Sequence, residues 1–262
     1  MRSSAAGSVE RALLPIVAPH APVPRLWHFS PDNPLTGHPY ALLEWVDGQR
    51  LEVVAPTLPD DDLAALGQLV GAALAGVHRV IFPRTGFFDA NLDVAQPISV
   101  GGDALLSYLR LCLVDGRGGA RLGETLTADL LGYVEREGRL LDTWNGPPCL
   151  VHGDFGGSNI LVRQTSARWG VAAVLDWEFA FSGSPFFDLG NLLRPPLGDR
   201  PSFSGAVHAG YTAAGGQLPA QWPALSRLAD LLSWADFLNR PETGEQLIHD
   251  ARTIIRRTIA GA

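Results

Sequence analysis

The 262-residue sequence contains no lysine, and all 20 of its basic residues are arginines. Lysine carries a compact ammonium that pairs with phosphate as a point charge, whereas the arginine fork has a different geometry and reach. Arginine is therefore not an easy replacement wherever a phosphate site depends on lysine. Any phosphate chemistry in this chain has to proceed without that residue.

Cysteine is scarce as well. Cys112 and Cys149 stand far apart without metal-site spacing, so we expect two buried core thiols and a reducing compartment. The seven histidines are scattered and form no HExxH pattern. We therefore expect no zinc site.

Long apolar runs are also missing. The longest, Leu63 to Val77, is too short and too rich in alanine to cross a membrane. Glu10 and Pro15 interrupt the N-terminal apolar stretch, so we expect no secretory signal and a cytoplasmic protein. The formal net charge of −7, without a basic stripe, disfavours a nucleic-acid partner.

Hydrophobic periodicity predicts a small strand-bearing piece followed by a mostly helical body, which is an α+β fold. Residues 23–29 and 40–46 are expected to form a hairpin with a long loop. Ser8 is the expected cap of the first helix. Helices are expected over 8–18, 59–78 (with Asp60, Asp61 and Asp62 in its first turn), 103–114, 127–144, 222–239 and 244–260.

The most informative stretch is "LVHGDFGGSNILV", which begins at residue 150. It places Asp154 on a Gly-rich loop and Asn159 at the start of a β-like run, 159–163. A second β-like run, 171–177, has the right length to pair with the first as an antiparallel hairpin. Asn159 and Asp176 should then emerge side by side at the same end of that hairpin.

An amide oxygen and carboxylates gathered at one place suit Mg²⁺, which takes few protein oxygens and completes its shell with phosphates and water. The Asp-x4-Asn spacing is that of the kinase catalytic loop, in which the Asp is the base and the Asn holds metal. A simpler interpretation is that Asp154 and Asn159 only cap turns. The His-Gly pair ahead of them, the hairpin behind and Asp176 at its exit favour the phosphate chemistry.

The motifs "HGDFGGSN" (152–159) and "DWEFAFSGSPFFDLGNLLR" (176–194) resemble those of the aminoglycoside phosphotransferase and choline kinase family, small-molecule kinases with a protein-kinase-like fold. The resemblance implies that Asp154 is the catalytic base and that His152 holds the catalytic loop in shape. It implies that Asn159 and Asp176 are the Mg²⁺ ligands. Asp188 is similar to the family's carboxylate that braces the loop, although a helix cap is its simpler role.

Upstream, "VER" at 9–11 is similar to the family's αC helix, which makes Glu10 its glutamate. "LLEWVDG" is similar to the hinge, where the Glu44 carbonyl and the Val46 N–H would face the adenine of ATP. The resemblance implies a reduced N-terminal β lobe over residues 1–47 and a mostly helical C-lobe, with the catalytic loop and metal site, over residues 48–262. ATP and Mg²⁺ are the implied cofactors. His78, at the end of the long helix, is expected to be a packing residue.

The sequence departs from the family where its first strands and its phosphate-binding lysine would lie. Few residues precede the αC-like helix, and one strand alone usually takes five or six. Three explanations are open: a fragment of an active parent, a partner chain that supplies the missing lobe, or a degenerate kinase that binds without turnover. The remaining strands should expose an edge and an apolar face, which favours self-association into a homo-oligomer.

The leading hypothesis is therefore an ATP- and Mg²⁺-dependent phosphotransferase that acts on a hydroxyl of a small molecule. The alternatives are a non-catalytic binding protein on a kinase-like C-lobe and, with less support, a metal-dependent phosphohydrolase. An amine-bearing acceptor could meet carboxylates beside indole rings, although a solvated helix face with buried tryptophans is the simpler interpretation. The candidate residues for that contact are Asp230, Asp236, Glu242, Glu245, Asp250, Trp222 and Trp234.

Overall fold

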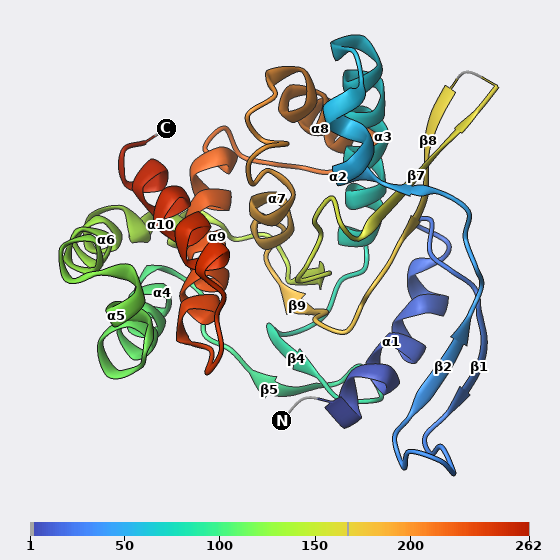
Figure 1. Ribbon diagram of the computed structural model, residues 1–262, viewed down its shortest axis with the longest axis horizontal. Helices are drawn as coiled ribbons and strands as arrows, with labels where there is room; N and C mark the ends of the chain where they lie inside the picture. The colour runs from blue at the N-terminus through green and yellow to red at the C-terminus, as the bar shows by residue number, and fades with distance from the viewer. Residues whose placement is uncertain (1–2, 167, 262) are drawn as a thin grey trace. The chain divides into compact units, whose positions relative to one another are not determined.

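The computed structural model describes residues 3–166 and 168–261, and the chain divides into two compact units (Figure 1). Unit 1 comprises Met1–Ile98 and Pro147–Pro219, and unit 2 comprises Ser99–Gly146 and Ala220–Ala262. The fold is α+β, as predicted, with small sheets and extensive helix. The expected boundary between residues 47 and 48 separates the N-lobe from the C-lobe of a kinase. The two compact units do not test that boundary, so it stays a prediction.

Unit 1 holds three small sheets. The first pairs β1 with β2, the second has the order β3-β7-β8, and the third the order β5-β4-β9-β6. The bounds are β1 Leu26–Ser30, β2 Tyr40–Leu43, β3 Gln49–Arg50, β4 Gly86–Phe88, β5 Val94–Pro97, β6 Cys149–Val151, β7 Ile160–Thr165, β8 Arg168–Val174 and β9 Phe181–Gly183. Both predicted hairpins are confirmed, because β1 pairs antiparallel with β2 and β7 with β8.

The first helix, α1 (Ser3–Val17), begins earlier than the sequence suggested. Ser8 lies inside the helix, so its assignment as the N-cap was wrong. Val9, Leu13 and Val17 recur every four residues and are all buried, which gives α1 one apolar face. Glu10 follows Val9 directly and is half-buried.

The long helix α3 (Asp60–His78) is confirmed, and it packs closely against α8 (Pro201–Ala213). Glycines allow this approach. A Cβ on Gly71 would lie 2.1 Å from the Val207 carbonyl oxygen, and one on Gly210 would lie 1.9 Å from that of Gln68. The backbones of α3 and α8 therefore meet directly near the middle of α3. The remaining helical elements of unit 1 are α2 Leu51–Val54, η1 Ala55–Thr57 and α7 Phe186–Leu192.

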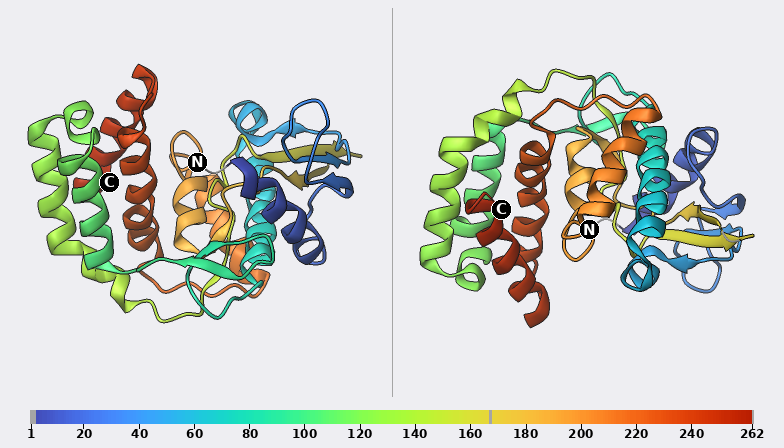
Figure 2. Two further views of the ribbon diagram at one scale, coloured as in Figure 1. Left: turned by 90° about the horizontal axis from the view of Figure 1, so that it is seen from below. Right: turned by 90° about the horizontal axis from the view of Figure 1, so that it is seen from above.

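Unit 2 is helical throughout the part that the structure describes (Figure 2, green and red segments). Its elements are α4 Gly102–Arg110, the π-helical turn η2 Leu111–Asp115, α5 Gly118–Leu122, α6 Glu124–Glu137, the 3-10 segment η3 Gly138–Thr143, α9 Trp222–Asn239 and α10 Glu245–Ile259. The expected helices at 222–239 and 244–260 are thus confirmed almost to the residue. The helix expected over 103–114 is α4 followed by the π-helical turn η2, and the helix expected over 127–144 is α6 followed by the 3-10 segment η3.

The Arg121 side chain forms hydrogen bonds with the segment that connects α9 and α10. Its guanidinium donates to the carbonyl oxygens of Leu238 at 2.6 Å and Pro241 at 2.9 Å, and to the Thr243 hydroxyl at 3.1 Å. It also donates to the Arg240 carbonyl. One side chain thereby satisfies the carbonyls that a helix C-terminus leaves without intrahelical partners.

Of the residues described, none belongs to a helix that is both long and apolar enough to cross a membrane. Cys112 and Cys149 are both buried free thiols, as expected.

Candidate active site

The Gly-rich loop between β6 and β7 brings Asp154 and Asn159 into direct contact. The Asn159 Nδ2 group donates to the Asp154 carboxylate at 2.8 Å and to the Asp154 backbone carbonyl at 2.9 Å. Both side chains are half-buried, so they are accessible while their positions are held. Because the amide nitrogen is used within the loop, the amide oxygen of Asn159 is the atom left to face a ligand.

The β7–β8 hairpin brings Asp176 to the same place. Ile160 pairs with Val174, and beyond that pair the Leu175 N–H donates to the Asn159 carbonyl at 2.8 Å. Asp176 is the next residue along the chain and is exposed. The predicted emergence of Asn159 and Asp176 at one end of the hairpin is therefore confirmed.

Asp176 adopts a left-handed backbone conformation, with φ of 65°. This region costs a non-glycine residue roughly 1 kcal/mol, and Asp and Asn tolerate it better than most. Strained backbone of this kind tends to persist where surrounding structure requires it, often at functional sites. An Asp176→Asn change removes the charge while keeping this tolerance, which makes it a clean probe of the site.

His152 is wholly buried beneath the loop. Burial lowers the pKa of its imidazole, so the neutral form is favoured. The bonds assign the tautomer: Nδ1 accepts from the Asp154 N–H at 3.2 Å, and Nε2–H donates to the Leu175 carbonyl at 2.9 Å. The ring lies 4.5 Å from the Trp177 ring. His152 thus connects the Asp154 backbone to that of Leu175, the residue before Asp176. Both ring nitrogens are used in these bonds, which fits a role in shaping the loop and not in the chemical step.

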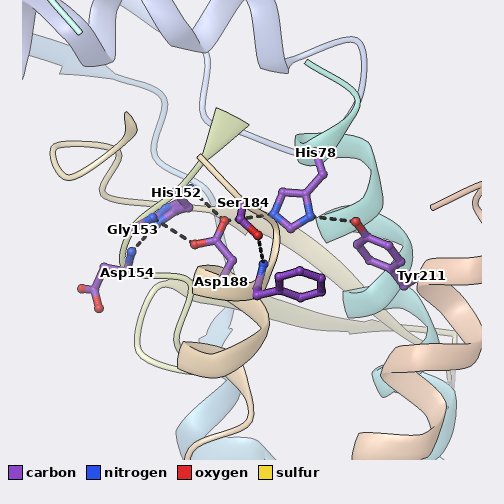
Figure 3. A network of polar contacts seen from close by, with 8 residues as sticks. His78, His152, Gly153, Asp154, Ser184, Asp188 and Tyr211 are labelled. Carbon is purple, nitrogen blue, oxygen red and sulfur yellow. Dashed lines mark hydrogen bonds and ion pairs between the residues drawn. The ribbon is translucent and has the colours of Figure 1, made fainter. Parts of the chain in front are cut away.

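Asp188, on α7, is also wholly buried, and it lies under the same loop (Figure 3). Its carboxylate accepts the N–H of His152 at 2.8 Å and that of Gly153 at 2.9 Å. Gly153 has φ of 82°, and a Cβ there would lie 2.5 Å from the Phe179 carbonyl oxygen. The two bonds to Asp188 are the contacts that a loop-bracing carboxylate would make. The Phe179 carbonyl leaves no room for a larger residue at position 153.

Further carboxylates lie around Asp176. Burial, followed by the nearby charges of Asp176 and Glu178, raises the pKa of Glu10, while a bond from the Trp177 N–H opposes this rise. Partial burial, Asp176 and Asp154 likewise raise the pKa of Glu178. Sequence reasoning missed Glu178, whose only signal was its position two residues after Asp176.

Glu10 consequently occupies a position that disfavours its charge. A raised carboxyl pKa means that ionisation weakens the fold: the cost is fully present above the raised pKa and disappears below the ordinary value of 4.5. We expect Glu10→Gln to raise Tm at neutral pH, since the amide oxygen can still accept the Trp177 N–H. The gain should shrink as pH falls towards 4.5.

Thermal unfolding of both proteins across that pH range checks this expectation. Glu242→Gln, at an exposed position in unit 2, is the control for loss of one negative charge. A gain in Glu10→Gln that did not depend on pH, or a loss of Tm at neutral pH, would contradict it.

The hinge candidates lie just beyond β2. Glu44 makes two bonds to Arg25: its N–H donates to the Arg25 carbonyl at 2.8 Å, and its side-chain carboxylate accepts the Arg25 N–H at 3.1 Å. Within the described chain, no backbone hydrogen bond uses the Glu44 carbonyl or the Val46 N–H. Those are the two groups assigned to adenine, and that assignment stays a prediction.

The structure offers little to a metal that needs many amino-acid ligands. Among the described residues, no three His, Cys, Asp or Glu side chains are grouped so as to hold a metal ion. The Asn159–Asp176 pair is a different kind of site, with one amide and one carboxylate oxygen. Such a pair suits a cation that retains water and phosphate ligands.

Solved structures similar to this chain include aminoglycoside phosphotransferases. The GDP complex of wild-type aminoglycoside 2'-phosphotransferase-IIIa aligns with a TM-score of 0.73 and 17% identity, over 98% of this chain and 83% of that one. The GDP and kanamycin complex of APH(2'')-IIIa gives 0.72 and 17%, over 98% and 83%. APH(4)-Ia in a ternary complex with AMP-PNP and hygromycin B gives 0.64 and 17%, over 99% and 83%. At such identities the likeness establishes the protein-kinase-like fold.

No curated protein sequence matches the chain. The family model described as "Phosphotransferase enzyme family" matches residues 2–231, which include the Gly-rich loop, the β7–β8 hairpin and Asp188. The chain therefore belongs to the aminoglycoside phosphotransferase (APH) family of phosphotransferase enzymes.

Proposed function

We propose that this protein is an ATP- and Mg²⁺-dependent phosphotransferase that transfers the γ-phosphoryl group to a hydroxyl of a small molecule. The observation that carries the proposal is the backbone bond from Leu175 to Asn159. It brings Asp176 beside Asn159, while Asn159 is itself bonded to Asp154. A base and two oxygen ligands thereby share one accessible place.

The residues present fit Mg²⁺. Asn159 keeps its amide oxygen available because its nitrogen is bonded to Asp154. Asp176 is exposed and lies among carboxylates whose mutual repulsion a cation would relieve. Asn159 and Asp176 would hold Mg²⁺, whose charge would offset that of the transferring phosphoryl group.

Asp154 is the proposed catalytic base. Its carboxylate is held by Asn159, and its backbone N–H is held by His152. This leaves the carboxylate oriented to accept a hydrogen bond from an acceptor hydroxyl and to take its proton as the phosphoryl group is transferred. Orientation of the nucleophile is the larger part of this role, because phosphoryl transfer depends mainly on positioning and charge.

The missing lysine favours a second candidate, a kinase-like protein that binds nucleotide without turning it over. In protein kinases a lysine pairs with the αC glutamate and with the nucleotide phosphates. Here Glu10, on α1, lies near Asp176 and Glu178, whose charges raise its pKa, and no lysine offsets them. If the protein does turn over ATP, no lysine helps to neutralise the phosphate charge, so Mg²⁺ would have to offset that charge without it.

For the acceptor we propose an aminoglycoside or another amine-bearing alcohol. The related structures contain kanamycin and hygromycin B. Three of the carboxylates considered for amine binding are engaged within unit 2, among them Asp250, which accepts a bond from the Gln246 amide at 2.9 Å. Asp230 is buried and accepts the Trp234 indole N–H at 2.7 Å, and Asp236 pairs with Arg240 at 3.1 Å. Glu242 and Glu245 are exposed and stay candidates.

We further propose a cytoplasmic protein that self-associates through the β1–β2 region. Trp27 is 58% exposed and Leu42 54%, so this hairpin presents large apolar side chains. Exposed apolar patches commonly mark association sites.

Phosphoryl transfer itself tests the function. The protein is incubated with MgATP and a panel of aminoglycosides, choline-like amines and amino-alcohols, and each acceptor is examined by mass spectrometry for one added phosphate. We expect one class to be phosphorylated by the wild-type protein and not by Asp176→Asn. Nucleotide binding without any phosphorylated acceptor would favour the non-catalytic candidate, and phosphate release without an acceptor would favour a phosphohydrolase.

A further inference from the structure

A buried chain of hydrogen bonds runs from α8 to the catalytic loop within unit 1 (Figure 3). The Tyr211 hydroxyl lies 2.9 Å from His78 Nδ1, and His78 Nε2 lies 3.1 Å from the Asp188 carboxylate. Asp188 in turn accepts the N–H groups of His152 and Gly153. The chain therefore ends on the two peptide groups that directly precede Asp154.

In a neutral His78 ring, the two neighbours of the imidazole decide which ring nitrogen carries the proton. Burial raises the pKa of the Tyr211 phenol, which therefore keeps its proton and can donate it to a hydrogen bond. If the phenol donates to Nδ1 of His78, the imidazole proton must sit on Nε2 and point at Asp188. The opposite tautomer would set a nitrogen lone pair against the carboxylate. Tyr211 thus selects the His78 tautomer that donates to Asp188.

The same bonds fix the orientation of the Asp188 carboxylate. Oδ2 receives both the His78 ring and the His152 N–H, and Oδ1 receives the Gly153 N–H. Asp188 is carried by α7, but among the described bonds to its carboxylate only the one from His78 comes from outside the loop. That bond connects the carboxylate to α3 and, through Tyr211, to α8.

Burial keeps bulk water away from both side chains and from Asp188. His78 is 8% exposed, Tyr211 3% and Asp188 0%. A buried polar group that loses its partner keeps its desolvation cost, so the loss of either contact is felt along the chain. His78 was expected to be a packing residue. Its hydrogen bonds to Tyr211 and Asp188 show that it also links two polar side chains.

We propose that His78 and Tyr211 are positioning residues for phosphoryl transfer, which hold Asp188 and through it the peptide groups that place Asp154. This inference rests on the proposed function. Neither residue contacts the site directly, so their effect should fall on the placement of the base and not on the binding of nucleotide.

The test combines hydrogen–deuterium exchange with steady-state kinetics. Tyr211→Phe deletes one hydroxyl, His78→Leu removes both contacts, and His78→Gln keeps a donor for Asp188 and an acceptor for Tyr211. Tyr133→Phe, in α6 of unit 2, is the matched hydroxyl deletion. We expect amide exchange at His152 and Gly153 to be about tenfold faster in Tyr211→Phe, which is the scale of one hydrogen bond.

We expect the exchange in His78→Leu to be faster still, and His78→Gln to recover part of the protection. In kinetics, kcat should fall in the same order while KM for ATP stays unchanged. Unchanged exchange at His152 and Gly153, or faster exchange with an unchanged kcat, would overturn the proposal. If wild type phosphorylates nothing while exchange still rises in the variants, the hydrogen-bonded coupling stands and the proposed function fails.

Discussion

Replacement of Asp154 by Asn is expected to lower kcat for phosphoryl transfer by about 10² to 10⁴-fold, the usual contribution of a positioned general base. The amide cannot take a proton from the acceptor hydroxyl. Its oxygen can still accept the bond from Asn159 Nδ2, which in the wild-type protein is 2.8 Å long. The loop should therefore keep its shape, and KM for ATP should change little.

Steady-state kinetics with the phosphorylated acceptor measure this effect directly. Asp129→Asn, on the exposed side of α6, is the matched control and should leave kcat unchanged. If Asp154→Asn kept more than a tenth of the wild-type kcat, Asp154 would be a turn cap, as the simpler interpretation holds.

Replacement of Asp188 by Ala should destabilise the fold by about 3–5 kcal/mol, the range for removal of one partner from a buried charged contact. Three donors would lose their acceptor at once: the His152 and Gly153 N–H groups and the His78 ring. These three donors are away from bulk solvent, so each would lose its hydrogen bond without regaining one from bulk water, and the folded state would lose stability. Denaturant unfolding measures the loss as a lower midpoint at an unchanged slope.

Asp188→Asn separates bonding from charge. The amide keeps one acceptor oxygen but turns a donor towards one of the three donors, so it should cost less than Asp188→Ala and still be clearly destabilising. Asp129→Asn again serves as the control. A loss below about 1 kcal/mol in Asp188→Ala is typical of an ordinary surface change and would assign Asp188 to helix capping alone.

The elements that could be predicted from the sequence are those whose signals are local. The hairpin over β7 and β8 is marked by two β-rich runs around a turn, and α3 and α9 by long apolar periodicity. The Asp154–Asn159 contact follows from a spacing of five residues. These features depend on short stretches of chain. The two helices were therefore predicted within a residue of their observed bounds, whereas the second hairpin strand, expected at 171–177, lies three residues earlier, at Arg168–Val174.

Other features depend on distant segments and left no such trace. The sheet of order β5-β4-β9-β6 consists of strands of three or four residues, too short for a periodic pattern. His78 meets Asp188 across 110 positions and Tyr211 across 133, so no spacing could indicate the contact. Ser8 resembled a helix cap, but the helix begins five residues earlier, at Ser3, and continues through Gly7.

Thermal unfolding with and without MgATP, in the wild-type protein and in Asp176→Asn, tests the metal–nucleotide site most directly. A ligand that binds only the folded state at a hundred times its Kd adds about 2.7 kcal/mol to the free energy of unfolding. We predict a clear rise in Tm for the wild-type protein with MgATP, and no rise for Asp176→Asn, whose unliganded Tm should be close to wild type. An equal rise in both proteins, or none in the wild type at millimolar MgATP, would contradict a site built from Asn159 and Asp176.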